Sequence, residues 1–141
     1  MNDQANAALS LYPALIVLLP LLGFLLNGLA GKKIASEKIS GIVGSGAIGL
    51  SFLLSVLVLF ELLGRPPGER SFTVILFEWI AAGGLSVNAA YKVDQLSVLM
   101  MLIVTGVGFL IHVYSIGYMH GDPAFWRFFA YLNLFIFMML N

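Results

Sequence analysis

The chain alternates long apolar runs with short polar breaks, a pattern typical of a polytopic membrane protein. Residues 9–29 carry no charge over 21 positions, and further uncharged runs follow at 39–60 and 95–119. A helix needs about 20 predominantly apolar residues to cross a bilayer. The pattern therefore predicts three membrane-spanning helices, over residues 9–30, 39–62 and 95–119.

The first apolar run is expected to be a retained helix rather than a cleaved signal peptide. It has no Lys or Arg before Lys32, it is longer than a signal peptide's apolar core, and it lacks a clear small-residue cleavage site. Pro13 is expected in its first turn, where a missing N–H breaks no hydrogen bond. Pro20 lies deeper and is expected to kink the helix, which membrane helices tolerate.

A fourth apolar segment, residues 127–141, is too short to cross a bilayer. Its last fourteen residues, Phe128–Asn141, would extend about 21 Å along a helix, against a hydrocarbon core of about 30 Å. The carbonyls at a helix end need partners that lipid cannot supply. We therefore expect a truncated fourth helix, and expect the sequence to be the front part of a longer protein.

Residues 64–93 form the only long stretch of mixed polarity. The segment Phe72–Trp79 is rich in β-branched and aromatic residues, Gly83-Gly84 follows, and polar and apolar positions then alternate up to Val93. This pattern predicts an extramembrane β-hairpin, with an interfacial amphipathic helix over Phe72–Ala82 as the alternative. The expected fold is an all-α polytopic membrane protein of three transmembrane helices and a truncated fourth. A short extramembrane β-hairpin joins the second and third helices.

Composition agrees with a membrane location and excludes several functions. The 141 residues are 60% hydrophobic and 10% charged, with zero net charge and no cysteine; the mean hydropathy is +1.00. A soluble domain carries about 25% charged residues. A neutral chain is a poor match for a nucleic-acid partner. Without cysteine, thiolate catalysis and Cys-ligated metal or iron–sulfur centres are excluded within this segment.

The charges in the short loops predict the orientation. Lys32, Lys33 and Lys38 follow the first span, whereas no Lys or Arg precedes it. The positive-inside rule places that loop in the cytoplasm, so the N-terminus and the 64–93 loop lie outside. We expect an integral protein of the bacterial inner membrane.

Three residues are candidates for a proton relay. His112 lies within the third span, where an ionisable side chain is costly and suggests a function; the alternative is a structural hydrogen bond to a neighbouring helix. Asp94 opens the same span, either complementing the helix dipole or serving proton entry or exit. Arg127 opens the fourth segment, as an interfacial anchor or as part of a relay.

Small residues in the second span predict close helix packing. Gly41, Ser45 and Gly49 repeat every four residues, so they share one helix face. The same stretch contains a GxGxxG pattern, but no strand precedes it and its surroundings are apolar, so a dinucleotide site is excluded. No Ser-His-Asp set, metal-ligand cluster or phosphate loop is present, and we expect no self-contained active site.

The third span and the segment after it are specific enough to suggest a family. They read Val104-Thr-Gly-Val-Gly-Phe-Leu-Ile-His112, then Tyr118-Met119, then Arg127-Phe-Phe-Ala-Tyr131. This region resembles the N-terminal part of subunit L (chain 5) of proton-translocating NADH–quinone oxidoreductase, respiratory complex I. The earlier residues resemble it more loosely, through Leu19-Pro-Leu-Leu-Gly-Phe24 and the glycine-rich second span.

The resemblance implies an antiporter-like subunit of the membrane arm that couples electron transfer from NADH to quinone with proton translocation. NAD, flavin, iron–sulfur clusters and quinone would belong to partner subunits, and this chain would bind no cofactor or metal. Its partners would be other membrane-arm subunits, the lipid bilayer and protons, and no nucleic acid. The family's main pumping Glu and Lys lie on later helices, so this segment would not pump alone. His112 and Arg127 match family motif positions.

Two other functions remain open from the sequence. The large subunit of a multisubunit Na⁺/H⁺ antiporter is similar to this family across the same region. A small membrane scaffold belongs to a different class, and for it His112 would matter for assembly and not for proton flux.

Overall fold

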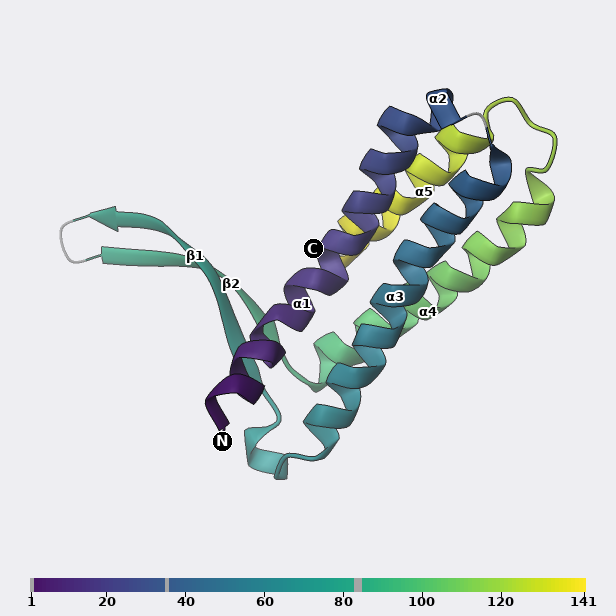
Figure 1. The fold of residues 1–141 in the computed structure, drawn as a ribbon. Helices are drawn as coiled ribbons and strands as arrows, with labels where there is room; N and C mark the ends of the chain where they lie inside the picture. Colours follow the sequence, from purple (N-terminus) through teal and green to yellow (C-terminus); the bar gives the residue numbers. More distant parts are fainter. Residues whose placement is uncertain (1, 35, 83–84) are drawn as a thin grey trace.

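The computed structural model describes residues 2–34, 36–82 and 85–141 as a helical bundle from which a two-stranded hairpin projects (Figure 1). The elements, in chain order, are α1 Asn2–Leu25, the π-helical turn η1 Leu26–Ala30, α2 Gly31–Ile34, α3 Glu37–Leu63, the 3₁₀ turn η2 Pro67–Glu69, β1 Phe72–Ala82, β2 Leu85–Val93, α4 Gln95–Tyr118 and α5 Phe125–Leu140. Within the described residues, three helical segments are long and apolar enough to cross a membrane: Leu11–Lys33, Glu37–Leu63 and Gln95–Tyr118. Helix α5 is apolar but shorter. The predicted fold class is confirmed.

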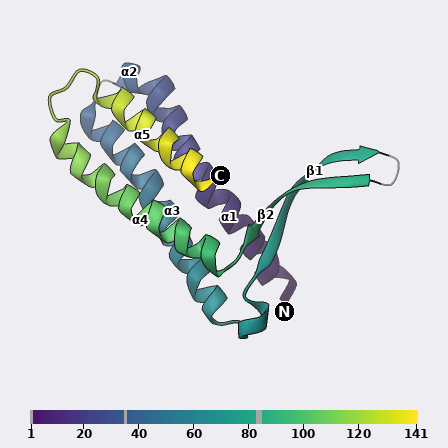
Figure 2. The same cartoon turned by 180° about the vertical axis from the view of Figure 1, so that it is seen from behind.

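The long helices α1, α3, α4 and α5 alternate in direction, and the hairpin leaves the bundle at the end where α3 finishes and α4 begins (Figures 1 and 2). Helix α3 packs against α1, α4 and α5, and α5 also packs against α1 and α4. Helix α1 begins before the predicted span, at Asn2, so Pro13 lies inside the helix. The expectation that Pro13 occupies the first turn was wrong, because the helix extends into the more polar N-terminal residues.

Strands β1 and β2 pair antiparallel from Phe72↔Val93 to Ala82↔Leu85, with register irregularities after Ile75 and after Glu78. The hairpin is therefore the correct choice over an amphipathic helix. The predicted Gly83-Gly84 turn lies outside the described residues. The base of the hairpin is held in the bundle, since Val93 is fully buried in one apolar cluster with Ile16 and Val58. Farther along β1, Phe77 and Trp79 are exposed.

A hydroxyl on α3 compensates for the proline in the middle of α1. Pro20 has no N–H, so the carbonyl of Ile16 loses its usual helical donor. The Ser51 hydroxyl donates to that carbonyl, with an oxygen–oxygen distance of 3.0 Å, and also lies 3.1 Å from the Ala47 carbonyl of its own helix. Ser51 is fully buried. A backbone group that lipid cannot satisfy is thus satisfied by the neighbouring helix.

Replacing Ser51 by alanine should lower the stability of the full-length protein by about 1 kcal/mol, because the Ile16 carbonyl would be buried without a donor. Ser55→Ala is the matched control: Ser55 is also fully buried, but its hydroxyl bonds only the Ser51 carbonyl of its own helix. Unfolding midpoints in mixed detergent micelles would measure both. Equal losses for the two variants would contradict the role of Ser51.

Candidate functional site

The three predicted relay candidates lie at separate places in the bundle. His112 is fully buried on α4. Asp94 precedes the first residue of the same helix, 18 residues earlier, which corresponds to about 27 Å of helix. Arg127 is exposed, near the start of α5. The structure does not bring Asp94 close to His112.

His112 has one ring nitrogen that is hydrogen-bonded and one that has no partner among the described residues. Its Nδ1 lies 2.7 Å from the Gly108 carbonyl oxygen, one turn earlier in α4. A carbonyl can only accept, so Nδ1 carries the proton. Nε2 is buried and has no hydrogen-bond partner in the part of the chain that the structure describes. The ring meets Phe129 of α5 edge-on, with 5.8 Å between centroids. The arrangement leaves Nε2 as the open nitrogen inside the bundle.

Asn133 is the residue of α5 that sequence reasoning missed as a site candidate. It is fully buried, and its Nδ2 donates to the Phe129 carbonyl at 2.9 Å. Its Oδ1 has no partner among the described residues. The amide fits because two glycines face it: a Cβ on Gly44 would lie 3.0 Å from Nδ2, and one on Gly23 would overlap Oδ1. Asn133 therefore lies where α1, α3 and α5 meet.

A second buried asparagine, Asn27, was missed as well. It stands in the π-helical turn η1, and its Nδ2 donates to the Ser40 carbonyl of α3 at 3.2 Å. The same Nδ2 would lie 3.2 Å from a Cβ on Gly44. Both asparagines could have been noticed in the sequence, because each is an amide side chain inside an apolar run. An amide in a bilayer is costly unless it forms hydrogen bonds or serves a function.

Ser45 lies on the α3 face that meets α4. Gly41 and Gly49, one turn before and one turn after Ser45 on the same face of α3, show which part of α4 lies opposite. A Cβ on Gly41 would lie 3.3 Å from Ile116, and one on Gly49 would lie 3.0 Å from Phe109. Ser45 is midway between the two glycines, and His112 is close to midway between their partners. The two helices are antiparallel, so Ser45 and His112 lie at the same level of the interface.

We use the name polar junction for three buried residues that share one property: Ser45 of α3, His112 of α4 and Asn133 of α5. Each has one buried polar atom without a partner in the described chain: Ser45 Oγ, His112 Nε2 and Asn133 Oδ1. Most buried polar groups in proteins are hydrogen-bonded to protein or to ordered water. The polar junction therefore has the capacity to hold water or to receive a polar group, and one of its members can titrate.

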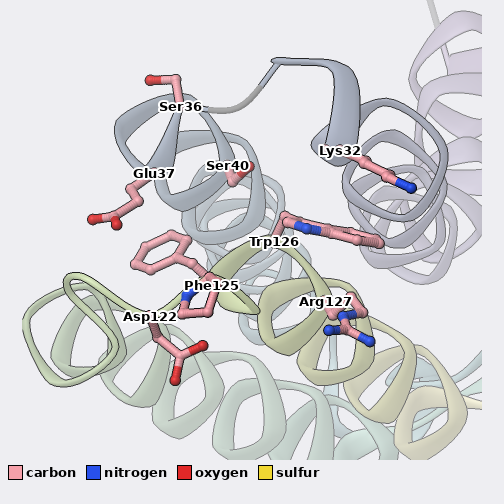
Figure 3. Close-up of a pocket in the computed structure, with 10 residues that line it drawn as sticks. Lys32, Ser36, Glu37, Ser40, Asp122, Phe125, Trp126 and Arg127 are labelled. Carbon is pink, nitrogen blue, oxygen red and sulfur yellow. The ribbon is translucent and has the colours of Figure 1, made fainter.

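Asp94 and Arg127 have local partners near the two ends of the bundle. The Asp94 carboxylate accepts from the Ser97 backbone N–H and from the Ser97 hydroxyl, both at 2.8 Å. These two bonds hold the pKa of Asp94 below its ordinary value. Arg127 lies with its guanidinium 5.5 Å from the centroid of the Trp126 ring. Arg127 and Trp126 also line a pocket of 630 Å³ between α5 and the α2–α3 turn (Figure 3).

Across the described ranges, no three His, Asp or Glu side chains are grouped so as to hold a metal ion.

Known proteins have sequences similar to this one. Residues 79–129 match the family model of the N-terminus of chain 5 of NADH-ubiquinone oxidoreductase (complex I). The chain is 44% identical over 126 residues to NADH-quinone oxidoreductase subunit L of Pseudomonas aeruginosa, covering 89% of this chain and 20% of that protein. The resemblance to the subunit L and chain 5 family is confirmed.

Two further relatives support the same assignment. Subunit L of Escherichia coli is 40% identical over 123 residues, which are 87% of this chain and 20% of that protein. Chain 5 of Allomyces macrogynus is 38% identical over 125 residues, which are 89% of this chain and 19% of that protein. The chain thus spans one fifth of the length of the bacterial subunit L proteins. The family-model match includes Asp94, His112 and Arg127, while Asn133 lies beyond it.

Gly44→Ala should destabilise the bundle by about 1–3 kcal/mol, because the added methyl would displace a packed side chain. A Cβ on Gly44 would lie 2.8 Å from the Phe129 ring as well as 3.0 Å from the Asn133 amide. Gly46→Ala is the control in the same helix, since a Cβ there meets nothing within 4 Å. Alanine is the better helix former, so this variant should be neutral or slightly stabilising. Unfolding midpoints would decide; equal stability of the two variants would rule out tight packing at Asn133.

Proposed function

We propose that this chain is the N-terminal part of a membrane-arm subunit of a proton-translocating NADH–quinone oxidoreductase. The observation that carries the proposal is identity of 44% to a subunit L over 89% of the chain. In this role the chain serves as part of an enzyme complex and has no active site of its own. NAD, flavin, iron–sulfur clusters and quinone are bound by partner subunits, and the chain packs against other membrane-arm subunits.

The antiporter alternative is not favoured, because the relatives described above are named as subunits of NADH-quinone or NADH-ubiquinone oxidoreductase. A scaffold role makes no use of a titratable ring with an open nitrogen. Burying such a ring in a bilayer is costly, and the structural bond of Nδ1 to its own helix would not require an imidazole.

Within this function, His112 is the residue proposed to exchange protons, through Nε2. Ser45 supports it by placing a second polar atom, unpartnered among the described residues, at the same level of the α3–α4 interface. We assign Asp94 to capping of α4, because its carboxylate accepts two bonds from Ser97 and lies far along the helix from His112. Arg127 is assigned to the membrane interface, because it is exposed beside Trp126.

His112→Ala in the full-length subunit should lower the number of protons pumped per NADH oxidised by more than it lowers the amount of assembled complex. His112→Asn is the decisive companion, since its amide can still donate to the Gly108 carbonyl but cannot titrate. Proton uptake in sealed vesicles and native gels would measure pumping and assembly. Restoration of pumping by asparagine would assign His112 a structural role instead.

We further propose that the protein lies in the bacterial inner membrane with its N-terminus and hairpin outside. The basis is Lys32, Lys33 and Lys38 in the loop after the first span.

The orientation can be tested with single cysteines, because this chain contains none. In a cysteine-free version of the full-length protein, Gly68→Cys should react with a membrane-impermeant maleimide in intact spheroplasts. A side chain there meets nothing within 4 Å. Lys33→Cys should react only after the cells are opened. The reverse pattern would show that the orientation is inverted.

A further inference from the structure

The end of the bundle where α2 meets α5 carries two adjoining cavities that share two residues. The first is the 630 Å³ pocket, which is lined by residues of α2, of the start of α3, of the loop before α5 and of the first turn of α5. The second, of 330 Å³, is a mainly apolar groove between α1 with η1 on one side and α5 on the other. Trp126 and Arg127 line both. The groove is otherwise lined by Phe24, Leu25, Gly28, Leu29, Ala130 and Tyr131.

Two cations of the pocket lie on one side of it. In Figure 3 the Trp126 ring extends between Lys32 and Arg127, and the carboxylates of Glu37 and Asp122 lie on the far side. Lys32 and Arg127 are both exposed, and neither forms an ion pair within the described residues. This side of the pocket therefore carries uncompensated positive charge.

The two carboxylates of the pocket are already bonded to loop groups. Glu37 lies 2.8 Å from His120 Nδ1 and accepts from the Gly121 N–H at 3.1 Å. Asp122 accepts from the Ala124 N–H at 2.6 Å. Within the described residues, neither carboxylate forms an ion pair with Lys32 or Arg127.

Trp126 is held in place by a glycine. A Cβ on Gly31 would lie only 2.7 Å from the Trp126 Cβ, so any other residue there would push α5 away from α2. The first span ends at Lys33 and α5 starts at Phe125, so Trp126 lies at the depth of the lipid headgroups. Trp, Lys and Arg are the side chains that anchor proteins at this depth.

We propose that these adjoining cavities bind one anionic phospholipid. Its phosphate is bound by Lys32 and Arg127, its glycerol region lies against the Trp126 ring that separates these two side chains, and one acyl chain follows the groove between α1 and α5. The continuity of charge and apolar groove is what selects a lipid over free phosphate, which would make no use of the groove. A partner helix in the groove would bring no anion to the two cations unless it carried an acidic residue. The inference depends on insertion of the chain in a membrane and is independent of the proposed enzymatic role.

Native mass spectrometry of the full-length protein, released from nanodiscs of mixed phosphatidylglycerol and phosphatidylcholine, tests this directly. The wild type should retain one phosphatidylglycerol, and the double variant K32Q/R127Q should retain it roughly tenfold less. The control K33Q/K38Q removes two cations from the same side that do not line the pocket, and it should behave as the wild type. Equal losses for the two double variants would indicate general surface charge and overturn the proposal.

A second variant separates a lipid from a free anion. Gly28→Leu fills the groove without changing charge, and the nearest atom to a Cβ there is 3.9 Å away, so the helix can accept it. It should reduce phosphatidylglycerol retention severalfold. Unchanged retention, or complete displacement of the lipid by inorganic phosphate, would assign the pocket to a simple anion.

A photoreactive residue at Leu29 identifies the occupant of the groove. Leu29 is 76% exposed and lines the apolar cavity. In the native membrane it should crosslink to phospholipid. A crosslink to protein alone, from the same or a neighbouring subunit, would show that a helix fills the groove and would refute the lipid site.

Discussion

The structure depends on one constraint: inside a bilayer, every polar group must find its partner within the protein. The carbonyl of Ile16, freed by Pro20, is met by Ser51 across the α1–α3 interface. Asn27 of η1, which continues α1, bonds the Ser40 carbonyl of α3. These bonds define how α1 and α3 pair, because apolar side chains alone gain little from leaving lipid for another apolar surface.

The polar junction departs from this constraint, because each of its residues has a buried polar atom without a partner in the described chain. Ser45 Oγ, His112 Nε2 and Asn133 Oδ1 are buried without partners in the chain as described. Glycines bring the helices close enough to enclose them, as Gly44 does beside Asn133. A core built only for packing would have apolar residues at these positions. A place for water or for proton exchange is consistent with three open polar atoms, one of them on an imidazole, and this is the physical basis for the role proposed for His112.

The helices and strands could be predicted from the sequence, whereas the polar junction could not. Uncharged runs longer than 20 residues predicted the spans, because the rise of a helix sets the length that crosses a bilayer. The alternation of polar and apolar residues before Val93 predicted the hairpin, because successive side chains of a strand point to opposite faces. His112 was recognisable because it is the one histidine inside a span. Asn133 and Asn27 were not recognised, because their importance comes from helices that meet only in the folded protein. Similarly, the start of α1 was misplaced because hydropathy does not define where a helix extends beyond the membrane.

The state of the His112 ring tests the central claim most directly. Solid-state NMR of the full-length protein in bilayers, with ¹⁵N-labelled histidine and His112→Asn to assign the signal, would report which ring nitrogen carries the proton. The account predicts that Nδ1 is protonated and bonded to the Gly108 carbonyl, while Nε2 is unprotonated and able to accept a proton. A ring protonated at Nε2 with a bare Nδ1 would contradict it, because the open nitrogen on which the junction's proposed function rests would not exist.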